Sequence, residues 1–326
     1  MNPKIEKDIP QVSIIASGLE VPWALAFLPA SQGEPDNGIL VTERAGKVKI
    51  VKDGKFKEIA TVAVKQTGES GLHGIAVDPK YPQNPYIYLY YTYSANGNDT
   101  SNKVSRFSFK DNTLSDEKVL VDKIPGAIFH DGGRIKFGPD GALYITTGDA
   151  QNPSLAQDKN SLAGKILRIV DEDKVEIYSY GHRNPQGITW DEKGKLWETE
   201  HGQSATDELN LIGQGKNYGW PIIRGNETKE DMISPVLQSG DNTWAPAGMA
   251  YYNGSLYFGA LRGQALFQAS VDGLELKEHF KGQFGRIRDV VLGPDNMIYI
   301  TTSNRDGRGN PVSNDDRIII INPNQL

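Results

Sequence analysis

One phrase recurs six times along the 326-residue chain: a short apolar run, a turn rich in Pro, Asp and Gly, and a second strand rich in aromatic residues. The copies follow one another at intervals of roughly 40 to 60 residues, which is typical of the four-stranded blades of a β-propeller. The sequence therefore predicts an all-β fold: a six-bladed β-propeller with four antiparallel strands per blade around a central channel. We expect a single domain over residues 1–326. The six copies span residues 23–43, 74–90, 135–145, 187–198, 248–258 and 290–300.

Further strands are expected after several copies of the phrase. Third strands are predicted at residues 46–51, 103–107 and 164–169, whereas the fourth strands leave a weaker signal. The apolar runs Val12–Ile15 and Arg317–Ile321 stand near opposite ends of the chain. We expect them to pair in the last blade and close the ring, because closure removes the exposed edges that an open sheet would present.

Composition limits the classes of function. The net charge of −6 argues against a nucleic-acid partner, which usually requires a basic face. No segment approaches the roughly 18 uninterrupted apolar residues of a membrane-spanning helix, so no membrane insertion is expected. The absence of cysteine excludes disulfides, thiolate metal sites and a cysteine nucleophile. Redox chemistry would therefore need a bound cofactor.

The repeat also predicts where a site lies. The segments that enter each innermost strand and those that join the second strand to the third should share one face of the ring. Polar residues gather in these segments, and we expect one pocket to collect them. The entry segments hold Glu69, His130, Arg183, Asn184, Trp244, Arg286 and Arg288, and the second-to-third connections hold Asp149, His201, Gly202, Gln203, Arg262, Asn304, Arg305 and Asp306.

Four arginines of this acidic chain fall on pocket-facing segments: Arg183, Arg262, Arg286 and Arg288. The planar guanidinium binds carboxylates in a bidentate manner and keeps its charge when buried. Any one of them could instead form an ordinary ion pair between blades. Four converging positions favour a ligand that carries several negative charges.

Five histidines are the available imidazole bases. His130 precedes an innermost strand and is followed closely by glycines that would let a ligand approach. A structural role is the default for any one of the five, and composition alone does not separate them. His73 is interpreted as core packing, His182 as a buried orienting residue and His279 as a surface residue.

Eight motifs resemble those of the soluble quinoprotein glucose and aldose sugar dehydrogenases, and they run in that family's order over nearly the whole chain. Each motif alone is weak evidence, but the set is specific. The matching segments are Gly68–Leu72, His130–Arg134, Thr147–Asp149, Gly181–Gly187, Glu200–Gln203, Asp207–Ile212, Asn217–Pro221 and Gly285–Asp289.

The resemblance implies PQQ (pyrroloquinoline quinone) and Ca²⁺ as cofactors, and oxidation of an aldose at its anomeric carbon to a lactone, with hydride passing to PQQ. It makes His130 the general base, Asp149 the carboxylate that orients it, and Arg183 a catalytic and cofactor-binding residue. The backbone carbonyls of Gly202 and Gln203 would bind the calcium ion. The implied PQQ-binding residues are Arg183, Asn184, His201, Arg262, Arg286, Arg288 and Asn304, and the implied sugar-binding residues are Glu69 and Trp244.

Four positions depart from the glucose enzymes. Glu69 and His201 stand where those enzymes carry glutamine, Phe129 where they carry a sugar-binding aspartate, and Gln203 where they carry proline. The long insertions of the glucose enzymes are also missing. The chain thus resembles the shorter aldose sugar dehydrogenases, which implies broad sugar tolerance, an external electron acceptor and a monomer. We expect a periplasmic or extracellular location, with a signal or anchor absent from these 326 residues.

Two other functions stay open at this stage. A calcium-dependent lactonase or esterase would use His130 and Asp149 but leave the arginines without a role. A non-enzymatic propeller that binds carbohydrate or protein would not respond to an added quinone. A fold does not by itself decide between such functions.

Overall fold

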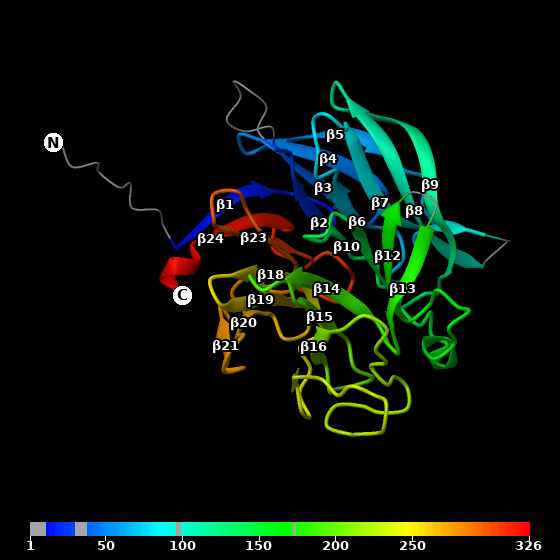
Figure 1. The fold of residues 1–326 in the computed structure, drawn as a ribbon. Coiled ribbons are helices and arrows are strands. Elements are labelled where there is room, and N and C mark those ends of the chain that lie inside the picture. The colour runs from blue at the N-terminus through cyan, green and yellow to red at the C-terminus, as the bar shows by residue number, and fades with distance from the viewer. Residues whose placement is uncertain (1–10, 30–37, 96–98, 172–173) are drawn as a thin grey trace.

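The computed structural model describes residues 11–29, 38–95, 99–171 and 174–326. Its strands form six antiparallel sheets of four strands, arranged as blades around a common axis (Figure 1). Each innermost strand contacts the innermost strand of the next blade, and the last contacts the first. The predicted six-bladed β-propeller is confirmed.

Five blades are built from four strands that follow one another along the chain. The first two are β2 (Pro22–Phe27), β3 (Ile39–Glu43), β4 (Lys47–Lys52) and β5 (Lys55–Thr61), and β6 (Leu72–Val77), β7 (Tyr86–Ser94), β8 (Thr100–Lys110) and β9 (Thr113–Pro125). The third is β10 (Ile135–Phe137), β11 (Leu143–Thr147), β12 (Lys165–Asp171) and β13 (Lys174–Tyr180). The fourth and fifth are β14 (Pro185–Trp190), β15 (Leu196–Glu200), β16 (Glu208–Ile212) and β17 (Leu237–Gln238), and β18 (Pro246–Tyr252), β19 (Ser255–Ala260), β20 (Ala265–Ser270) and β21 (Leu276–His279).

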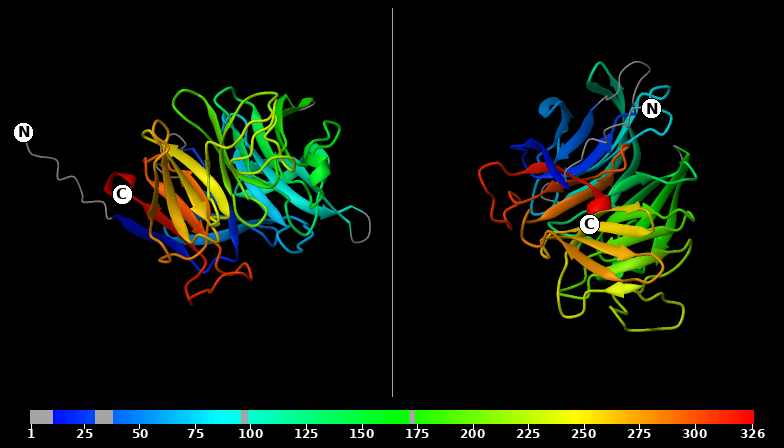
Figure 2. Two further views of the ribbon diagram at one scale, coloured as in Figure 1. Left: turned by 90° about the horizontal axis from the view of Figure 1, so that it is seen from below. Right: turned by 90° about the vertical axis from the view of Figure 1, so that its left-hand side faces the viewer.

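The sixth blade joins the two ends of the chain. It consists of β22 (Ile287–Leu292), β23 (Ile298–Thr302), β24 (Arg317–Ile321) and, outermost, β1 (Val12–Ser17). In the antiparallel pair, Val12 lies opposite Ile321 and Ser17 opposite Arg317. The blue and red strands lie side by side in every view (Figure 2). The expected closure of the ring by its terminal strands is therefore confirmed.

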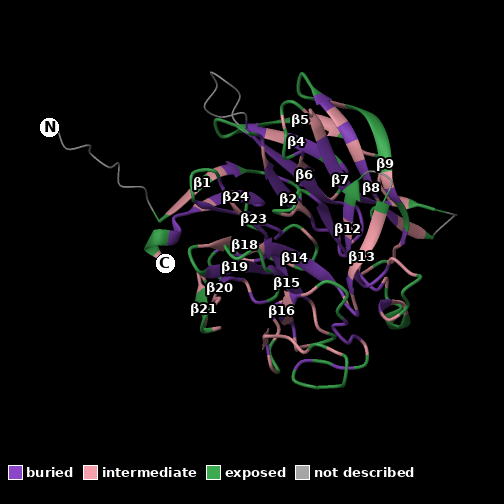
Figure 3. Ribbon diagram, in the orientation of Figure 1, coloured by how far each residue is buried: buried purple, intermediate pink, exposed green. Residues whose placement is uncertain are grey.

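The strands become less buried with increasing distance from the propeller axis. The inner strands lie between neighbouring blades and are buried over most of their length, whereas β5 is largely exposed (Figure 3). Apolar side chains such as Leu40, Leu72 and Leu89 pack between the first and second blades. An outermost strand buries little, so it needs few apolar residues. This explains the weak sequence signal of the fourth strands.

Helical structure in the described ranges is limited to two short 3₁₀ turns, Pro153–Ala156 and Pro323–Gln325. No helix found there is long and apolar enough to cross a membrane.

Candidate active site

The two kinds of connection chosen from the sequence do meet on one face of the ring, around a cavity of about 390 Å³. Every blade except the first contributes to its wall. The lining residues are Glu69, Phe129, His130, Arg183, Asn184, His201, Gly202, Gln203, Ser204, Asp207, Thr243, Ala245, Leu261, Arg262, Arg286 and Arg308.

His130 is held by one buried carboxylate. Its Nδ1 lies 2.7 Å from Oδ1 of Asp149, which is completely buried, while the imidazole is 19% exposed. A carboxylate only accepts hydrogen bonds, so Nδ1 carries the proton and donates it to Asp149. Nε2 makes no hydrogen bond within the described chain. The side chain thus offers the cavity a nitrogen with a free lone pair.

Close backbone packing fixes His130. Its φ is +68°, a left-handed value that side chains other than glycine rarely adopt and that is often found at functional sites. A Cβ on Gly148 would lie 1.8 Å from the His130 carbonyl oxygen, and one on Gly132 would lie 2.7 Å from the carbonyl of Thr146. Only glycine permits this approach. Gly132 and Gly148 therefore allow the close packing that holds the His130 backbone, and glycines near His130 also leave room for a ligand.

Asp149 is itself positioned by three donors. Besides His130, its carboxylate accepts the backbone N–H of Gln151 at 2.9 Å and the indole N–H of Trp220 at 2.8 Å. Its own N–H donates to the carbonyl of Arg183 at 2.8 Å. Because these contacts come from different blades, the orientation of the imidazole depends on the assembled ring.

A buried lysine braces the β11–β12 connection that carries Asp149. Lys165 is completely buried, and its Nζ donates to the carbonyls of Leu155, Ala156 and Ala163 at 2.8, 3.1 and 2.6 Å. Three carbonyls satisfy the three N–H groups of the ammonium. The Lys165 ammonium thus holds three backbone carbonyls of the β11–β12 connection together.

Buried side-chain nitrogens without a hydrogen-bond partner lie at and near the cavity. They are Nε of Arg183 and Nε2 of His201, which line it, and the donor Nε atoms of Arg288 and Arg44, which do not. The Arg262 side chain lines the cavity and is exposed. Buried donors that lack a partner cost free energy, so their presence around one cavity favours a ligand rich in anionic acceptors. This is the donor set that a quinone with several carboxylates requires.

Arg286 and Arg288 flank Ile287, which is completely buried in the apolar core, and Arg286 lines the cavity. Arg286 contacts Oδ2 of Asp306 through Nε at 2.9 Å and Nη2 at 2.8 Å. Arg288 lies deeper, donating to Oε1 of Gln186 at 2.6 Å. Burial lowers the pKa of Arg288 to about 9, which leaves it charged at neutral pH.

The loop expected to bind a metal lies at the same cavity. Asp207 accepts the N–H of Gly202 at 2.9 Å and holds the N–H groups of Trp244 and Ala245 with its other oxygen. In the described part of the chain, no hydrogen bond is donated to the carbonyl of Gly202 or Gln203. These two carbonyls are therefore free to bind a hard cation such as Ca²⁺.

An ion pair lies at the mouth of the cavity. Arg308 donates to Oε1 of Glu69 at 2.6 Å and stacks over the ring of Phe129, while Oε2 of Glu69 faces the N–H of His130 at 3.4 Å. Burial opposes the charge of Glu69, but interactions with His201 and Arg308 lower the pKa of Glu69 to about 2. Glu69 is thus an ionised acceptor beside His130.

Like Arg288, two other expected contact residues do not line the cavity. The indole of Trp244 packs against Phe258 and Phe267 in the core of the fifth blade. Asn304 is 4% exposed, and its Oδ1 accepts the N–H of Arg286. Asn304 is thus placed to orient Arg286. The contacts of these two side chains with a ligand therefore stay a prediction, and neither side chain lines the cavity in this structure.

His73 is packed as expected. Its ring lies between Trp23 and Tyr90, with centroids 4.9 and 5.8 Å away, and Nε2 donates to the carbonyl of Glu69 at 2.9 Å. His182 is also buried, whereas His279 is partly exposed.

The packing of His73 predicts a pH dependence of stability. Burial lowers its pKa from 6.5 to about 3, so below pH 6.5 the unfolded chain takes up a proton that the folded chain refuses. Stability is full above pH 6.5 and falls as the pH drops. Between pH 7 and pH 5, His73 should cost about 2 kcal/mol of unfolding free energy. Urea unfolding of wild type and His73→Phe at both values checks this. An equal loss in the variant would contradict it.

Sequence reasoning missed several residues of the site. Arg308 follows Asn304, Arg305 and Asp306 in the same connection, so the rule that selected those three residues could have found it as well. Trp220 comes from the connection between β16 and β17, which that rule does not cover. The sequence repeat does not indicate that the Trp220 side chain reaches Asp149 of the neighbouring blade.

The fold and the site together define a class of enzyme. Its members are closed six-bladed propellers in which the loops of several blades build an arginine-lined cavity with a histidine–carboxylate pair. A family model described as glucose/sorbosone dehydrogenase matches residues 19–314. The chain belongs to this family, whose members are oxidoreductases that act on sugars.

Individual relatives agree with this assignment. An aldose sugar dehydrogenase of Escherichia coli is 31% identical over 346 residues, which cover 91% of each chain. A solved structure of a putative oxidoreductase (glucose dehydrogenase) from Thermus thermophilus is 40% identical, with a TM-score of 0.88 over 95% of this chain and 99% of that one. The PQQ-bound aldose sugar dehydrogenase of Streptomyces coelicolor is 36% identical, with a TM-score of 0.87 over 95% of this chain and 97% of that one.

Proposed function

We propose that this chain oxidises aldoses at the anomeric carbon to lactones, using PQQ and Ca²⁺. The observation that carries the proposal is the His130–Asp149 pair, which faces a cavity surrounded by arginine donors without partners. The pair supplies a base, and the donors supply a binding site for a polyanionic cofactor. The PQQ-bound relative from Streptomyces coelicolor supports the choice of cofactor.

The cofactor would be held by groups on opposite walls of the cavity. Arg183, Asn184, Arg262 and Arg286 line it and would hold carboxylates and quinone oxygens, with Arg288 behind them. The carbonyls of Gly202 and Gln203 would hold the calcium ion. When bound, PQQ supplies a quinone that accepts a hydride and Ca²⁺ supplies Lewis-acid polarisation of that quinone.

His130 takes the proton of the anomeric hydroxyl. Loss of hydride from an alcohol carbon leaves a protonated carbonyl unless the hydroxyl proton departs as well, so a positioned base lowers the barrier. Nε2 of His130 accepts that proton while Nδ1–H remains bonded to Asp149, whose negative charge stabilises the imidazolium. Arg183 completes the arrangement because its carbonyl holds the N–H of Asp149 while its guanidinium faces the cavity.

Glu69 and Arg308 would form the sugar side of the site. Glu69 is an acceptor-only group close to the backbone of His130, and sugar hydroxyls are donors. Phe129, where the glucose enzymes carry an acidic residue, offers an aromatic face instead. An aromatic face makes few directional hydrogen bonds to sugar hydroxyls, so we expect the site to accept several aldoses.

The test is reconstitution of the purified apoprotein. PQQ, Ca²⁺ and an aldose together should reduce an artificial dye and release the lactone, and omission of any one should abolish the reaction. Hydrolysis of a lactone in the absence of PQQ would instead establish the hydrolase. Sugar binding without either reaction would establish the non-enzymatic propeller.

The proposal also covers the electron acceptor, the oligomeric state and the location of the enzyme. Electrons would leave reduced PQQ for an external acceptor. We also propose that the chain works as a monomer in the periplasm or outside the cell.

The calcium assignment makes a specific prediction. Gln203→Ala should bind Ca²⁺ within about threefold of wild type, because the proposed ligand is a main-chain carbonyl. Asp207→Asn is the contrasting variant, since Asp207 fixes the N–H of Gly202, and it should weaken binding by roughly 10 to 100-fold. Calorimetric titration of both apoproteins measures this. Loss of binding in Gln203→Ala would refute main-chain ligation.

A further inference from the structure

Three carboxylates lie inside the fourth blade, away from the cavity surface. Glu198 and Glu200 are two residues apart on β15 and therefore project from the same face of the sheet. Across the pair of strands, Asn210 lies opposite Glu198, and Glu208 lies opposite Glu200. Glu198 is completely buried and Glu200 is 3% exposed. Like charges placed directly opposite each other in a buried sheet destabilise it unless something neutralises them.

Salt bridges within the described ranges do not neutralise these carboxylates, although the charge of Arg183 is close enough to interact with Glu200. No lysine or arginine in the described ranges pairs with Glu198, Glu200 or Glu208. The amide of Asn210 donates to all three, at 3.0, 3.4 and 3.2 Å, although it has only two hydrogens.

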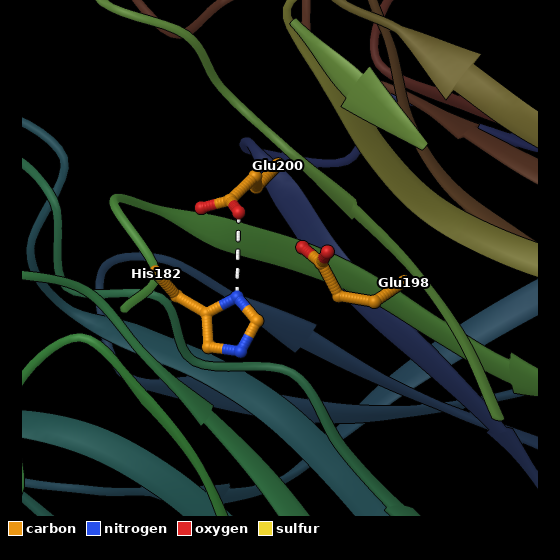
Figure 4. A group of neighbouring side chains, drawn as sticks. All are labelled: His182, Glu198 and Glu200. Atoms are coloured by element: carbon orange, nitrogen blue, oxygen red, sulfur yellow. Dashed lines mark hydrogen bonds and ion pairs between the residues drawn. The ribbon is translucent and has the colours of Figure 1, made fainter. Parts of the chain in front are cut away.

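Donor atoms converge beside the ring of His182. Nδ1 of His182 lies 3.3 Å from Oε1 of Glu200, and ligand atoms from His182, Glu198 and Glu200 all lie within 4.8 Å of one another (Figure 4). Oε1 of Glu198 is buried and makes no hydrogen bond. Two ligands of a tetrahedral metal with bonds of about 2.0 to 2.1 Å stand about 3.3 Å apart, so the spacing suits such an ion.

The atoms that face away from this point are each held by a neighbour. Nε2 of His182 is hydrogen-bonded to Oγ of Ser179 at 2.8 Å, and Oε2 of Glu200 accepts the N–H of Arg183 at 2.6 Å. Oε2 of Glu198 is held by the facing asparagine amide. Outer contacts of this kind orient the ligands in metal sites, because they fix the imidazole tautomer and the carboxylate direction.

We propose that His182, Glu198 and Glu200 bind a buried divalent transition metal, of which Zn²⁺ is the best match to one imidazole and two carboxylates. The ion balances the charges of its two carboxylate ligands and ties the entry of β14 to β15. Since Glu200 holds the backbone of Arg183, the ion also braces one wall of the cavity. This site uses side chains and is separate from the calcium proposed at the carbonyls of Gly202 and Gln203.

The experiment uses full-length apoprotein without quinone or sugar, so its outcome is independent of the proposed oxidation. Chelator-treated protein is dialysed against Zn²⁺, and bound metal and Tm are measured. We expect one tightly held Zn²⁺ and a higher Tm. Glu198→Gln keeps the shape of the side chain. Its amide oxygen should accept the hydrogen bond from Asn210, so that its NH₂ group, which cannot bind a metal, points into the site. Affinity should fall at least about 100-fold, and the surface variant Glu278→Gln should bind like wild type.

Failure of wild type to bind Zn²⁺, or equal affinity in Glu198→Gln, would overturn the proposal and leave the carboxyl groups neutralised by protons. Should Glu198→Gln fail to fold, crystals of Zn²⁺-loaded wild type decide the question. An anomalous difference peak between His182, Glu198 and Glu200 is expected. A peak elsewhere, or none, contradicts the site.

Discussion

We expect Arg286→Ala to weaken the binding of PQQ to the apoprotein by roughly 2 to 5 kcal/mol, or about 30-fold to several thousandfold. Arg286 is 6% exposed, lines the cavity and is anchored by Asp306 through two nitrogens. Its removal deletes a charged donor and leaves the buried carboxylate of Asp306 without its closest partner. Both changes oppose the binding of an anionic cofactor.

Titration of the apoprotein with PQQ measures the effect of Arg286→Ala. Arg305→Ala is a matched control because Arg305 lies on the neighbouring loop and bonds to the carbonyl of Asp315 instead of lining the cavity. The melting temperature of both variants separates lost binding from lost folding. An unchanged PQQ affinity together with a raised KM for sugar would place Arg286 in the sugar subsite instead.

His130→Ala should lower kcat by roughly 10² to 10⁴-fold, the range that a positioned base contributes. The variant keeps the arginines and the carbonyls of Gly202 and Gln203, so PQQ and Ca²⁺ should still bind. The matched control is His279→Ala, which removes an imidazole on β21, far from the lining of the cavity. A kcat near the wild-type value in His130→Ala would return His130 to a structural role.

The repeat was sufficient to predict the blades and the face that carries the site. Its limit is that it places backbone segments and not side chains. Trp244 is in the predicted segment, yet its indole turns into the aromatic core of the fifth blade because Phe258 and Phe267 offer it apolar contacts there. Asn304 is likewise in the predicted loop but contacts the backbone of Arg286.

Contacts that cross between blades were beyond prediction from the sequence. The bond from Trp220 to Asp149 joins residues 71 positions apart, and the ion pair between Arg308 and Glu69 spans 239 positions. Neither pair belongs to a common periodic pattern. The carboxylates of the fourth blade were missed for a different reason. Acidic residues at alternate positions of a strand are typical of a solvent-facing side, whereas every residue of β15 is buried in the structure.

The proposed chemistry is tested most directly by single-turnover mixing of oxidised, PQQ- and Ca²⁺-loaded enzyme with saturating aldose. The aldose carries hydrogen or deuterium at the anomeric carbon, and the quinone absorbance is followed. If hydride leaves that carbon while His130 takes the proton, wild type should show fast bleaching that deuterium slows, and His130→Ala should bleach at least about 100-fold more slowly. Bleaching that is insensitive to deuterium, or equally fast in His130→Ala, would contradict the account.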